Sequence, residues 1–493
     1  MRKTSLIFIL LALACLCIAD IEVSTLSPRT EISRLFIGAI TPDFGVLFEQ
    51  RQAFLNTLVF AICGLSLALP FGILLAATFR FRLVRYYCAF VRSIHEIFWA
   101  FLFIPLVGLN SFCGILALAI PYAGIFGKVF AEILQEADQK PLRGLPRHCS
   151  RLSGFIYFVL PTIWHDVKHY TLYRFECALR TSAVLGFIGL PTLGFHLETA
   201  FREGYYSEAA AILYAFFAII GTVHYWMRPK LVWVYVLGAI LLISKEITLS
   251  LDNISRFFTY EILPWPIRRS GVADGSYNTH FSFTEVSDWA GSIFNSEIIP
   301  GAFQTLLLTQ ISLVGSGIVA LLLFPWISKH FFGPLVRTLS HYTLVAMRTV
   351  PDYIVAYILI LVLGPSMLPA ILAISIHNGA ILAQLMRQKT DATPLPIGSS
   401  KHRLNRYLFE IIPQVFGQFL AFLFYRWEVI MRESAILGIL GIYTLGFYID
   451  SAIAEDKMDT AILIILSMAF LNLCIDSISQ RVRAHLRLSI KIV

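Results

Sequence analysis

The sequence predicts an all-α polytopic membrane protein with about 12 transmembrane helices, arranged as two parallel six-helix repeats. Three observations predict it: an apolar composition, twelve apolar stretches, and one charged motif that occurs twice. The 493 residues are 57% hydrophobic and only 14% charged, whereas soluble domains carry about a quarter charged residues. A water-soluble core of ordinary shape cannot hide so much apolar surface, so we expect the chain in a membrane.

Each apolar stretch is long enough, or nearly so, to cross the hydrocarbon core as a helix, which takes about 20 residues. Backbone polar groups in lipid must be satisfied within the segment, so these runs indicate helices and not barrel strands. The first six lie near residues 4–19, 54–79, 90–109, 112–128, 155–190 and 207–227. The second six lie near residues 231–249, 301–326, 342–363, 367–386, 413–440 and 459–479.

The distribution of Lys and Arg predicts that both termini are cytoplasmic. With the N-terminus inside, every loop on the cytoplasmic side is basic, including residues 80–85, 128–152 and 387–406, as the positive-inside bias requires. The opposite side receives residues 20–50 and a periplasmic loop at about 250–299, which are longer and of mixed charge. Topology therefore explains the net charge of +8, and no nucleic acid partner is expected.

The charged motif "YRFECALRTSAVLG" at 173–186 recurs as "YRWEVIMRESAILG" at 425–438, a shift of 252 residues with eight of fourteen positions identical. Upstream, a shift of 256 places "VRSIHE" on "MRTVPD". Six spans separate equivalent points, an even number, so the two copies share one orientation. We expect the first repeat at 1–230 and the second at 231–493. The span near 231–249 then corresponds to the first span, which is expected to be retained and not cleaved as a signal segment.

Six charged residues of the repeated motif lie inside two predicted spans, where each ionised side chain costs about 2.5–3.5 kcal/mol on insertion scales. The four-residue spacing of Glu176 and Arg180, repeated in the second copy, favours ion pairs along the helix. Arg174 and Arg426 have no obvious partner on their own helices and could line a path for an anion. The alternative is that all six charges form a buried network, or reach the interface, and only hold the bundle together. These candidates for the translocation path are Arg174, Glu176, Arg180, Arg426, Glu428 and Arg432.

A glycine-rich stretch follows each charged helix, and glycine permits close helix approach and sharp bends. We expect a gate or hinge on the outer side, with plain tight packing as the alternative. The six glycines are Gly186, Gly189, Gly194, Gly438, Gly441 and Gly446.

An amphipathic, charged segment interrupts the spans at 127–161 and again at 383–413. A short surface helix of this kind could dock a soluble partner, and an ordinary cytoplasmic loop is the alternative. The chain has no phosphate-binding loop motif, no zinc-protease motif and no serine elbow. Its cysteines and histidines show no ligand spacing. We therefore expect no enzyme activity in this chain, no cofactor and no metal site.

The segments "GKVFAEILQEAD", "SRLSGFIYFVLP" and "YTLYRFECALRTSAVLGFIGLPTLGF" resemble the membrane permease of phosphonate-type ABC importers, an inner-membrane component that depends on a binding protein. The resemblance covers nearly the whole chain twice, as if two permease repeats of the type I importer class were fused. It implies a coupling loop of the EAA type at about 128–161, with Glu132 and Glu136 at its acidic positions. The second coupling loop, at about 384–413, is degenerate because Gln388 replaces the first of these acids.

The resemblance implies partners as well as a cargo. Separate cytoplasmic ABC ATPase subunits would grip the coupling loops, and a periplasmic binding protein would deliver a phosphonate or related phosphorus oxyanion. The location implied is the bacterial inner membrane, with lipid around the helices. The alternative from another class is a secondary active anion transporter with two six-helix halves, which would need no partner protein.

Overall fold

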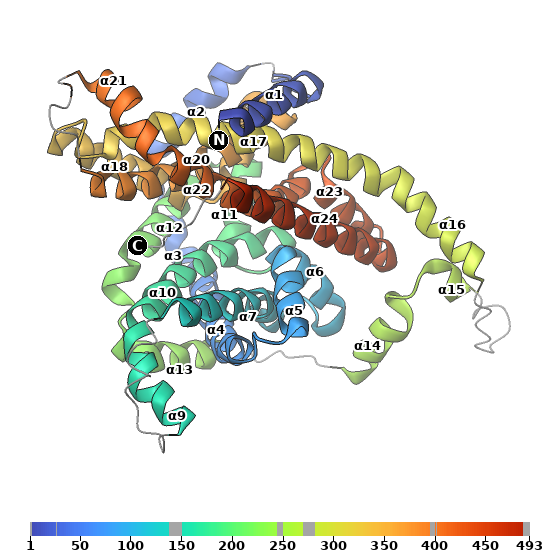
Figure 1. Ribbon diagram of the computed structural model, residues 1–493. Helices are drawn as coiled ribbons and strands as arrows, with labels where there is room; N and C mark the ends of the chain where they lie inside the picture. Colours follow the sequence, from blue (N-terminus) through green and yellow to red (C-terminus); the bar gives the residue numbers. More distant parts are fainter. Residues whose placement is uncertain are drawn as a thin grey trace. The chain divides into compact units, whose positions relative to one another are not determined.

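The structure, a computed structural model, describes residues 2–25, 27–137, 150–243, 250–269, 282–394, 400 and 402–486. Every regular element in that part of the chain is a helix, so the predicted all-α class is confirmed (Figure 1). The helices form two compact units. One unit contains residues 36–257, and the other contains residues 1–35 and 258–493.

The unit of residues 36–257 is centred on α4 (Arg51–Ala77) and α7 (Ser111–Glu136), which pack along their lengths. Small residues permit this approach, since a Cβ on Gly64 would lie 2.8 Å from Leu118 Cβ. The other helices of this unit are α3 (Gly45–Glu49), α5 (Arg82–Ser93), α6 (Glu96–Val107), α9 (Arg151–Gly154), α10 (Leu160–Val184), α11 (Leu193–Glu203), α12 (Tyr206–Trp226), α13 (Val232–Leu242) and α14 (Leu251–Arg256).

The second unit has the same kind of centre, formed by α17 (Ile299–Ile327) and α20 (Met367–Ala392). A Cβ on Gly379 would lie 2.6 Å from Val319 Cβ, so glycine again allows two spans to approach closely. The other helices that lie wholly in this unit are α1 (Arg2–Ile18), α15 (Trp265–Arg269), α16 (Phe283–Ile293), α18 (Pro334–Thr349), α19 (Asp352–Leu363), α21 (Arg403–Asn405), α22 (Ile412–Ser434), α23 (Leu445–Ala454) and α24 (Met458–His485). Helix α2 (Pro28–Ile40) runs across the division between the units.

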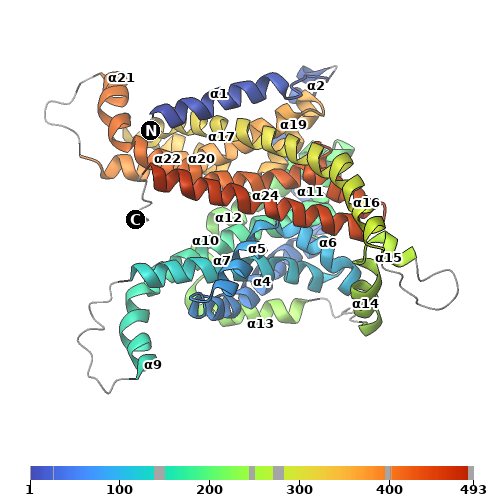
Figure 2. The same ribbon diagram turned by 45° about the vertical axis from the view of Figure 1, so that its right-hand side comes forward.

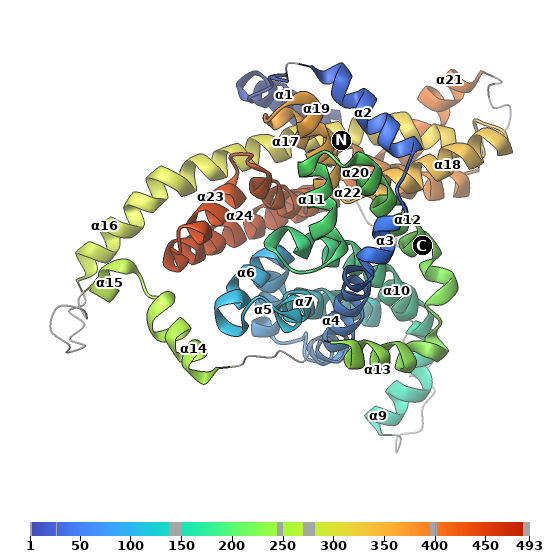
Figure 3. The same cartoon turned by 180° about the vertical axis from the view of Figure 1, so that it is seen from behind.

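The first helix of each predicted repeat packs in the unit that holds most of the other repeat. Helix α1 packs on α17 (Figure 2). Gln310 Nε2 of α17 donates a hydrogen bond of 3.2 Å to the carbonyl of Phe8 in α1. Helix α13 packs on α4 (Figure 3). The compact units are defined by contacts between helices, whereas the predicted repeats are defined by sequence similarity. The two divisions therefore differ in the first helix of each repeat, because α1 belongs to the unit of the second repeat and α13 to the unit of the first.

Seven helices of the described residues are long and apolar enough to cross a membrane, or up to ten if each of three bent pairs counts as one span. Two stretches predicted as single spans are such pairs: α5 with α6, bent by 93°, and α18 with α19, bent by 90°. In the second pair Pro351 lies in the break, and the helical conformation is disfavoured for the residue before a proline. In the first pair the side chain of His95 accepts a hydrogen bond from the backbone N–H of Ile97 and so caps α6.

The same local structure recurs at matching positions of the two predicted repeats. Thr57 Oγ1 accepts a 2.9 Å hydrogen bond from the backbone N–H of Leu193 at the start of α11. Thr305 Oγ1 accepts a 3.0 Å bond from the N–H of Leu445 at the start of α23. Each threonine therefore joins a long central helix to the helix after the glycine-rich turn.

Candidate functional site

The six charges of the repeated motif lie on α10 and α22, at corresponding positions along each helix. Each helix has a proline in its first turn, within a helical run that continues from the preceding turn, so the missing proline N–H interrupts the regular hydrogen bonds there. A short π-helical turn precedes each one, Phe155–Val159 before α10 and Arg406–Ile411 before α22. The two charged helices are thus built alike, and they differ in the partners that surround their charges.

Arg174 is partly buried and is held by two tyrosines of its own helix. Its Nε donates a 2.7 Å hydrogen bond to the hydroxyl of Tyr170. Its guanidinium lies 5.1 Å from the ring centre of Tyr170 and 5.5 Å from that of Tyr173, within the range of cation–π attraction. No carboxylate of the described residues lies within ion-pair distance of Arg174. The expectation that it lacks a partner on its own helix was wrong, because tyrosine can satisfy arginine without a carboxylate.

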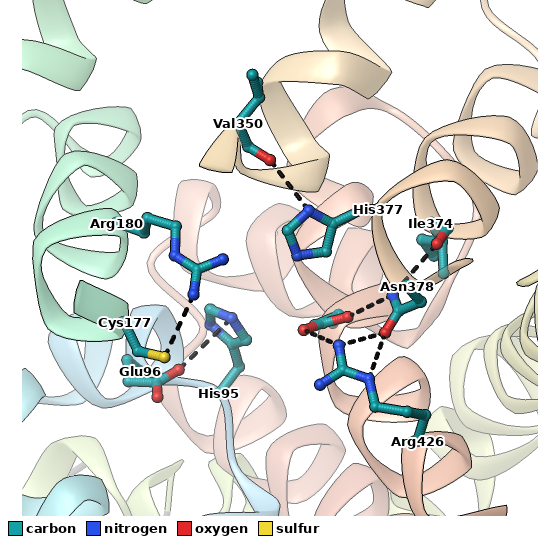
Figure 4. Close-up of polar contacts among 10 residues, drawn as sticks. His95, Glu96, Cys177, Arg180, Val350, Ile374, His377, Asn378 and Arg426 are labelled. Carbon is teal, nitrogen blue, oxygen red and sulfur yellow. Dashed lines mark hydrogen bonds and ion pairs between the residues drawn. The ribbon is translucent and has the colours of Figure 1, made fainter. Parts of the chain in front are cut away.

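Arg426 is 8% exposed and belongs to a compact polar network (Figure 4). Its Nε donates a 2.8 Å hydrogen bond to Asn378 Oδ1, and its Nη2 donates to the same oxygen. Nη2 also lies 3.7 Å from a carboxylate oxygen of Glu433. Asn378 Nδ2 donates a 2.9 Å bond to the other oxygen of Glu433. The expectation of no partner on its own helix was therefore wrong for Arg426 too, because α22 supplies Glu433 and α20 supplies Asn378.

The first predicted ion pair along a helix does not form. Glu176 Oε1 lies 3.3 Å from Nδ1 of His224 on α12, and not beside Arg180. Arg180 Nη2 donates a 3.3 Å hydrogen bond to Cys177 Sγ (Figure 4). In the second copy Glu428 and Arg432 are both partly buried on α22, and their pairing stays a prediction.

The glycine-rich turns show a packing reason for the glycines that occur in both copies. A Cβ on Gly194 would lie 1.8 Å from the carbonyl oxygen of Ala183, and one on Gly446 would lie 1.8 Å from that of Ala435. No side chain fits at such distances. The other four glycines have related reasons: Cβ atoms on Gly186 and Gly438 would lie 2.1 Å from a backbone nitrogen, and Gly189 and Gly441 have φ of 89° and 86°. These contacts give the packing alternative a structural basis, and the gating role stays a prediction.

Two buried carboxylates that sequence reasoning did not single out lie at the breaks of the bent pairs. Glu96 is 5% exposed in the first turn of α6, and its carboxylate lies 3.5 Å from Nε2 of His95 (Figure 4). Asp352 is 8% exposed in the first turn of α19. A carboxylate at a helix N-terminus faces the positive end of the helix dipole. The "VRSIHE" and "MRTVPD" alignment was the signal that could have found them.

The predicted coupling residues of the first copy lie at the exposed end of α7. Glu136 is the last residue of that helix, and Glu132 Oε1 lies 3.9 Å from Lys128 Nζ. Gln388 is also exposed, near the end of α20. Within the two coupling segments, residues 138–149, 395–399 and 401 lie outside the described residues.

The end of α20 is fastened to the turn that follows α17 through Asp391, which sequence reasoning missed. Asp391 Oδ1 accepts hydrogen bonds of 2.8 Å from Ser328 Oγ and 3.0 Å from the backbone N–H of Lys329. Its other oxygen lies 3.5 Å from Nε of Arg387. Asp391 of the second coupling segment is therefore satisfied within the chain, whereas Glu132 and Glu136 are exposed.

Comparison with known proteins finds relatives among transport permeases. The chain is 27% identical over 229 residues to a phosphite transport system permease protein of Stutzerimonas stutzeri, which is 44% of this chain and 83% of that protein. It is 26% identical over 431 residues to a phosphate-import permease protein of Mycolicibacterium smegmatis, which is 80% of this chain and 76% of that protein. No protein-family model and no solved structure matches the chain. The resemblance drawn from the sequence is confirmed: the chain is related to import permeases, and it is a multi-pass membrane protein.

Proposed function

We propose that this relative of import permeases is the transmembrane permease subunit of an ABC importer for phosphonates or related phosphorus oxyanions. The observation that carries the proposal is the similarity over 431 residues to a phosphate-import permease, because it spans 80% of this chain. The relative named for phosphite matches 83% of its own length but only 44% of this chain, so it is a much shorter protein. That ratio supports two fused permease repeats in one chain, at 1–230 and 231–493.

The proposed topology has twelve crossings with both termini in the cytoplasm of a bacterial inner membrane. Seven helices would cross singly and three bent pairs would each supply one crossing. The shorter apolar helices α1 and α13 would supply the last two, and each packs on the first long helix of the other sequence repeat. Matching threonine hydrogen bonds at the starts of α11 and α23 support the paired arrangement.

The chain carries no motor of its own in this proposal, so a separate ATPase pair and an extracytoplasmic binding protein supply energy and cargo. The exposed carboxylates of Glu132 and Glu136 suit a docking surface for the ATPase. Asp391 is engaged within the chain, which supports unequal docking of the two coupling loops.

The test is uptake by purified chain in proteoliposomes, with and without its ATPase and binding protein. ATP-driven uptake of inorganic phosphate, phosphite or methylphosphonate that requires both partners is the expected result. Uptake by the chain alone, driven by an ion gradient, would support a secondary transporter and refute the proposal. Labelling of single cysteines placed in 128–152 and 387–406 tests the topology, because the two segments must react from the same side.

A further inference from the structure

The two copies differ in the groups that surround their equivalent arginines. The shift of 252 residues that relates Arg174 to Arg426 also relates Thr181 to Glu433. The upstream shift of 256 relates Tyr122 to Asn378. One copy therefore has two hydroxyl groups where the other has a carboxylate and an amide.

In the second copy, the charge of the arginine is balanced inside the protein. Arg426 and Glu433 lie seven residues apart on α22, two helical turns, so both project from one face. Asn378 of α20 accepts from the arginine and donates to the carboxylate, and the arginine is only 8% exposed. A buried pair that is bridged by hydrogen bonds carries no net charge, and removal of one member leaves the other unpaired at a large cost.

In the first copy, the same places hold neutral groups. Tyr122 of α7 is 2% exposed, and its hydroxyl lies 3.4 Å from Thr181 Oγ1. Phe126 follows Tyr122 by four residues on α7, and its ring packs edge-to-face on that of Tyr170 of α10, with ring centres 6.1 Å apart. Arg174 lies four residues after Tyr170 and seven before Thr181 on α10, so it shares the helix face that meets α7. Its positive charge has tyrosine partners but no carboxylate among the described residues.

We propose that the two copies have divided the anion site, so that Arg174, with the hydroxyls of Tyr122 and Thr181, contacts the phosphorus oxyanion. Arg426 is then a structural residue that holds α22 to α20 through Asn378 and Glu433. The physical reason is that an unbalanced guanidinium in a medium of low dielectric constant attracts an anion strongly, whereas a neutralised pair does not. Arginine is also a preferred hydrogen-bond donor to phosphate oxygens, and hydroxyl groups can donate to the same oxygens. This inference rests on the proposed function.

The test uses the complete transporter in proteoliposomes and measures ATP-driven uptake of inorganic phosphate and methylphosphonate. Arg174→Gln should lower uptake about 10- to 100-fold, the range for loss of a hydrogen bond to a charged group. Thr181→Glu, which builds the carboxylate of the second copy into the first, should give a loss of similar size. Thr181→Gln is the matched control of the same size without the charge, and it should lose much less than Thr181→Glu.

The second arm measures folded protein and thermal unfolding, which do not depend on transport. Arg426→Gln should lower the amount of folded protein, because it leaves Glu433 buried without its cation. Adding Glu433→Gln should restore most of the folded protein and of the uptake. Equal uptake by the wild type, Arg174→Gln and Thr181→Glu would overturn the inference. A second result would also overturn it: Arg426→Gln folds fully but loses uptake, and adding Glu433→Gln does not restore the uptake. If the wild type itself moves neither anion when energised, the proposed function fails and the anion role of Arg174 fails with it, while the unfolding arm still decides the role of Arg426.

Discussion

Truncation of Phe8 tests whether α1 is a packed part of the unit formed by residues 1–35 and 258–493. The Phe8 ring lies 4.9 Å from the ring of Phe424 and 5.3 Å from that of Trp427, both in edge-to-face geometry. Both partner side chains are buried on α22, at 1% and 8% exposure. The backbone of the same turn accepts the hydrogen bond from Gln310 of α17. Phe8 therefore contacts two helices of the unit at once.

The expected cost follows from these contacts. Each edge-to-face aromatic pair contributes about 0.5–1.5 kcal/mol beyond area burial, so the two pairs together contribute about 1–3 kcal/mol. Burial from lipid adds little, because lipid tails are as apolar as the helix surface that they cover. We therefore expect Phe8→Ala to lower the free energy of unfolding by about 1–3 kcal/mol. Ile7 is the matched control, since it is 62% exposed on the same turn, and Ile7→Ala should change stability by less than about 0.5 kcal/mol.

The assay is thermal unfolding of the purified chain in detergent, followed by tryptophan fluorescence. Trp427 lies beside Phe8, so its signal reports loosening of this contact as well as global unfolding. Phe8→Ala should unfold at a clearly lower temperature than Ile7→Ala. Equal unfolding temperatures for the two variants would show that α1 does not pack through Phe8, and the exchange of first helices would lose its support.

Three further predictions follow from single contacts. Gly446→Ala should lower stability by about 1–3 kcal/mol or more because its Cβ would lie 1.8 Å from a backbone oxygen, whereas Gly238→Ala, with nothing within 4 Å, should be neutral; equal unfolding temperatures would contradict this. Arg268 Nη2 lies 3.1 Å from the buried carboxylate of Asp459, so Arg268→Met should cost about 3–5 kcal/mol; adding Asp459→Asn should recover part of that loss in thermal unfolding, and no recovery would argue against a coupled pair. Glu132→Gln should weaken binding of the partner ATPase about two- to fivefold, as expected for one exposed charge pair, and unchanged binding in a pull-down titration would remove Glu132 from the docking surface.

The sequence predicts the helical class and the positions of the charged helices, because both depend on local patterns. Long apolar runs give the spans, and the duplicated motif places Arg174 and Arg426 at equivalent points of α10 and α22. The bend before Asp352 also has a local signal, since Pro351 ends the preceding helix. The matching bend before Glu96 has no such signal, because a histidine cap is not distinguishable from an ordinary histidine in a single sequence.

Contacts between helices were beyond the reach of local patterns. Helices α1 and α13 could each pack on the long helix of either copy, α4 or α17, and these two helices have similar sequence patterns. The periodicity within a span does not show which of the two copies the span will pack against. Glu433 could have been found from its seven-residue spacing to Arg426. Asn378 could not, because it comes from α20 and its side chain is defined only once α20 lies against α22.

The unequal partners of the two arginines bear on the proposed fusion of two permease repeats. In a permease built from two identical chains, any substitution appears twice, so a carboxylate that neutralises one arginine neutralises both. A fused chain allows Glu433 to balance Arg426 while Thr181 leaves Arg174 with its charge unbalanced. The ends of α7 and α20 also differ, although at positions that the shift of 256 does not relate: Glu132 is exposed, whereas Asp391 is engaged by Ser328. Within the proposed repeats, the second copy therefore balances its arginine inside the protein, whereas the first copy keeps an arginine and hydroxyl groups that an anion can contact.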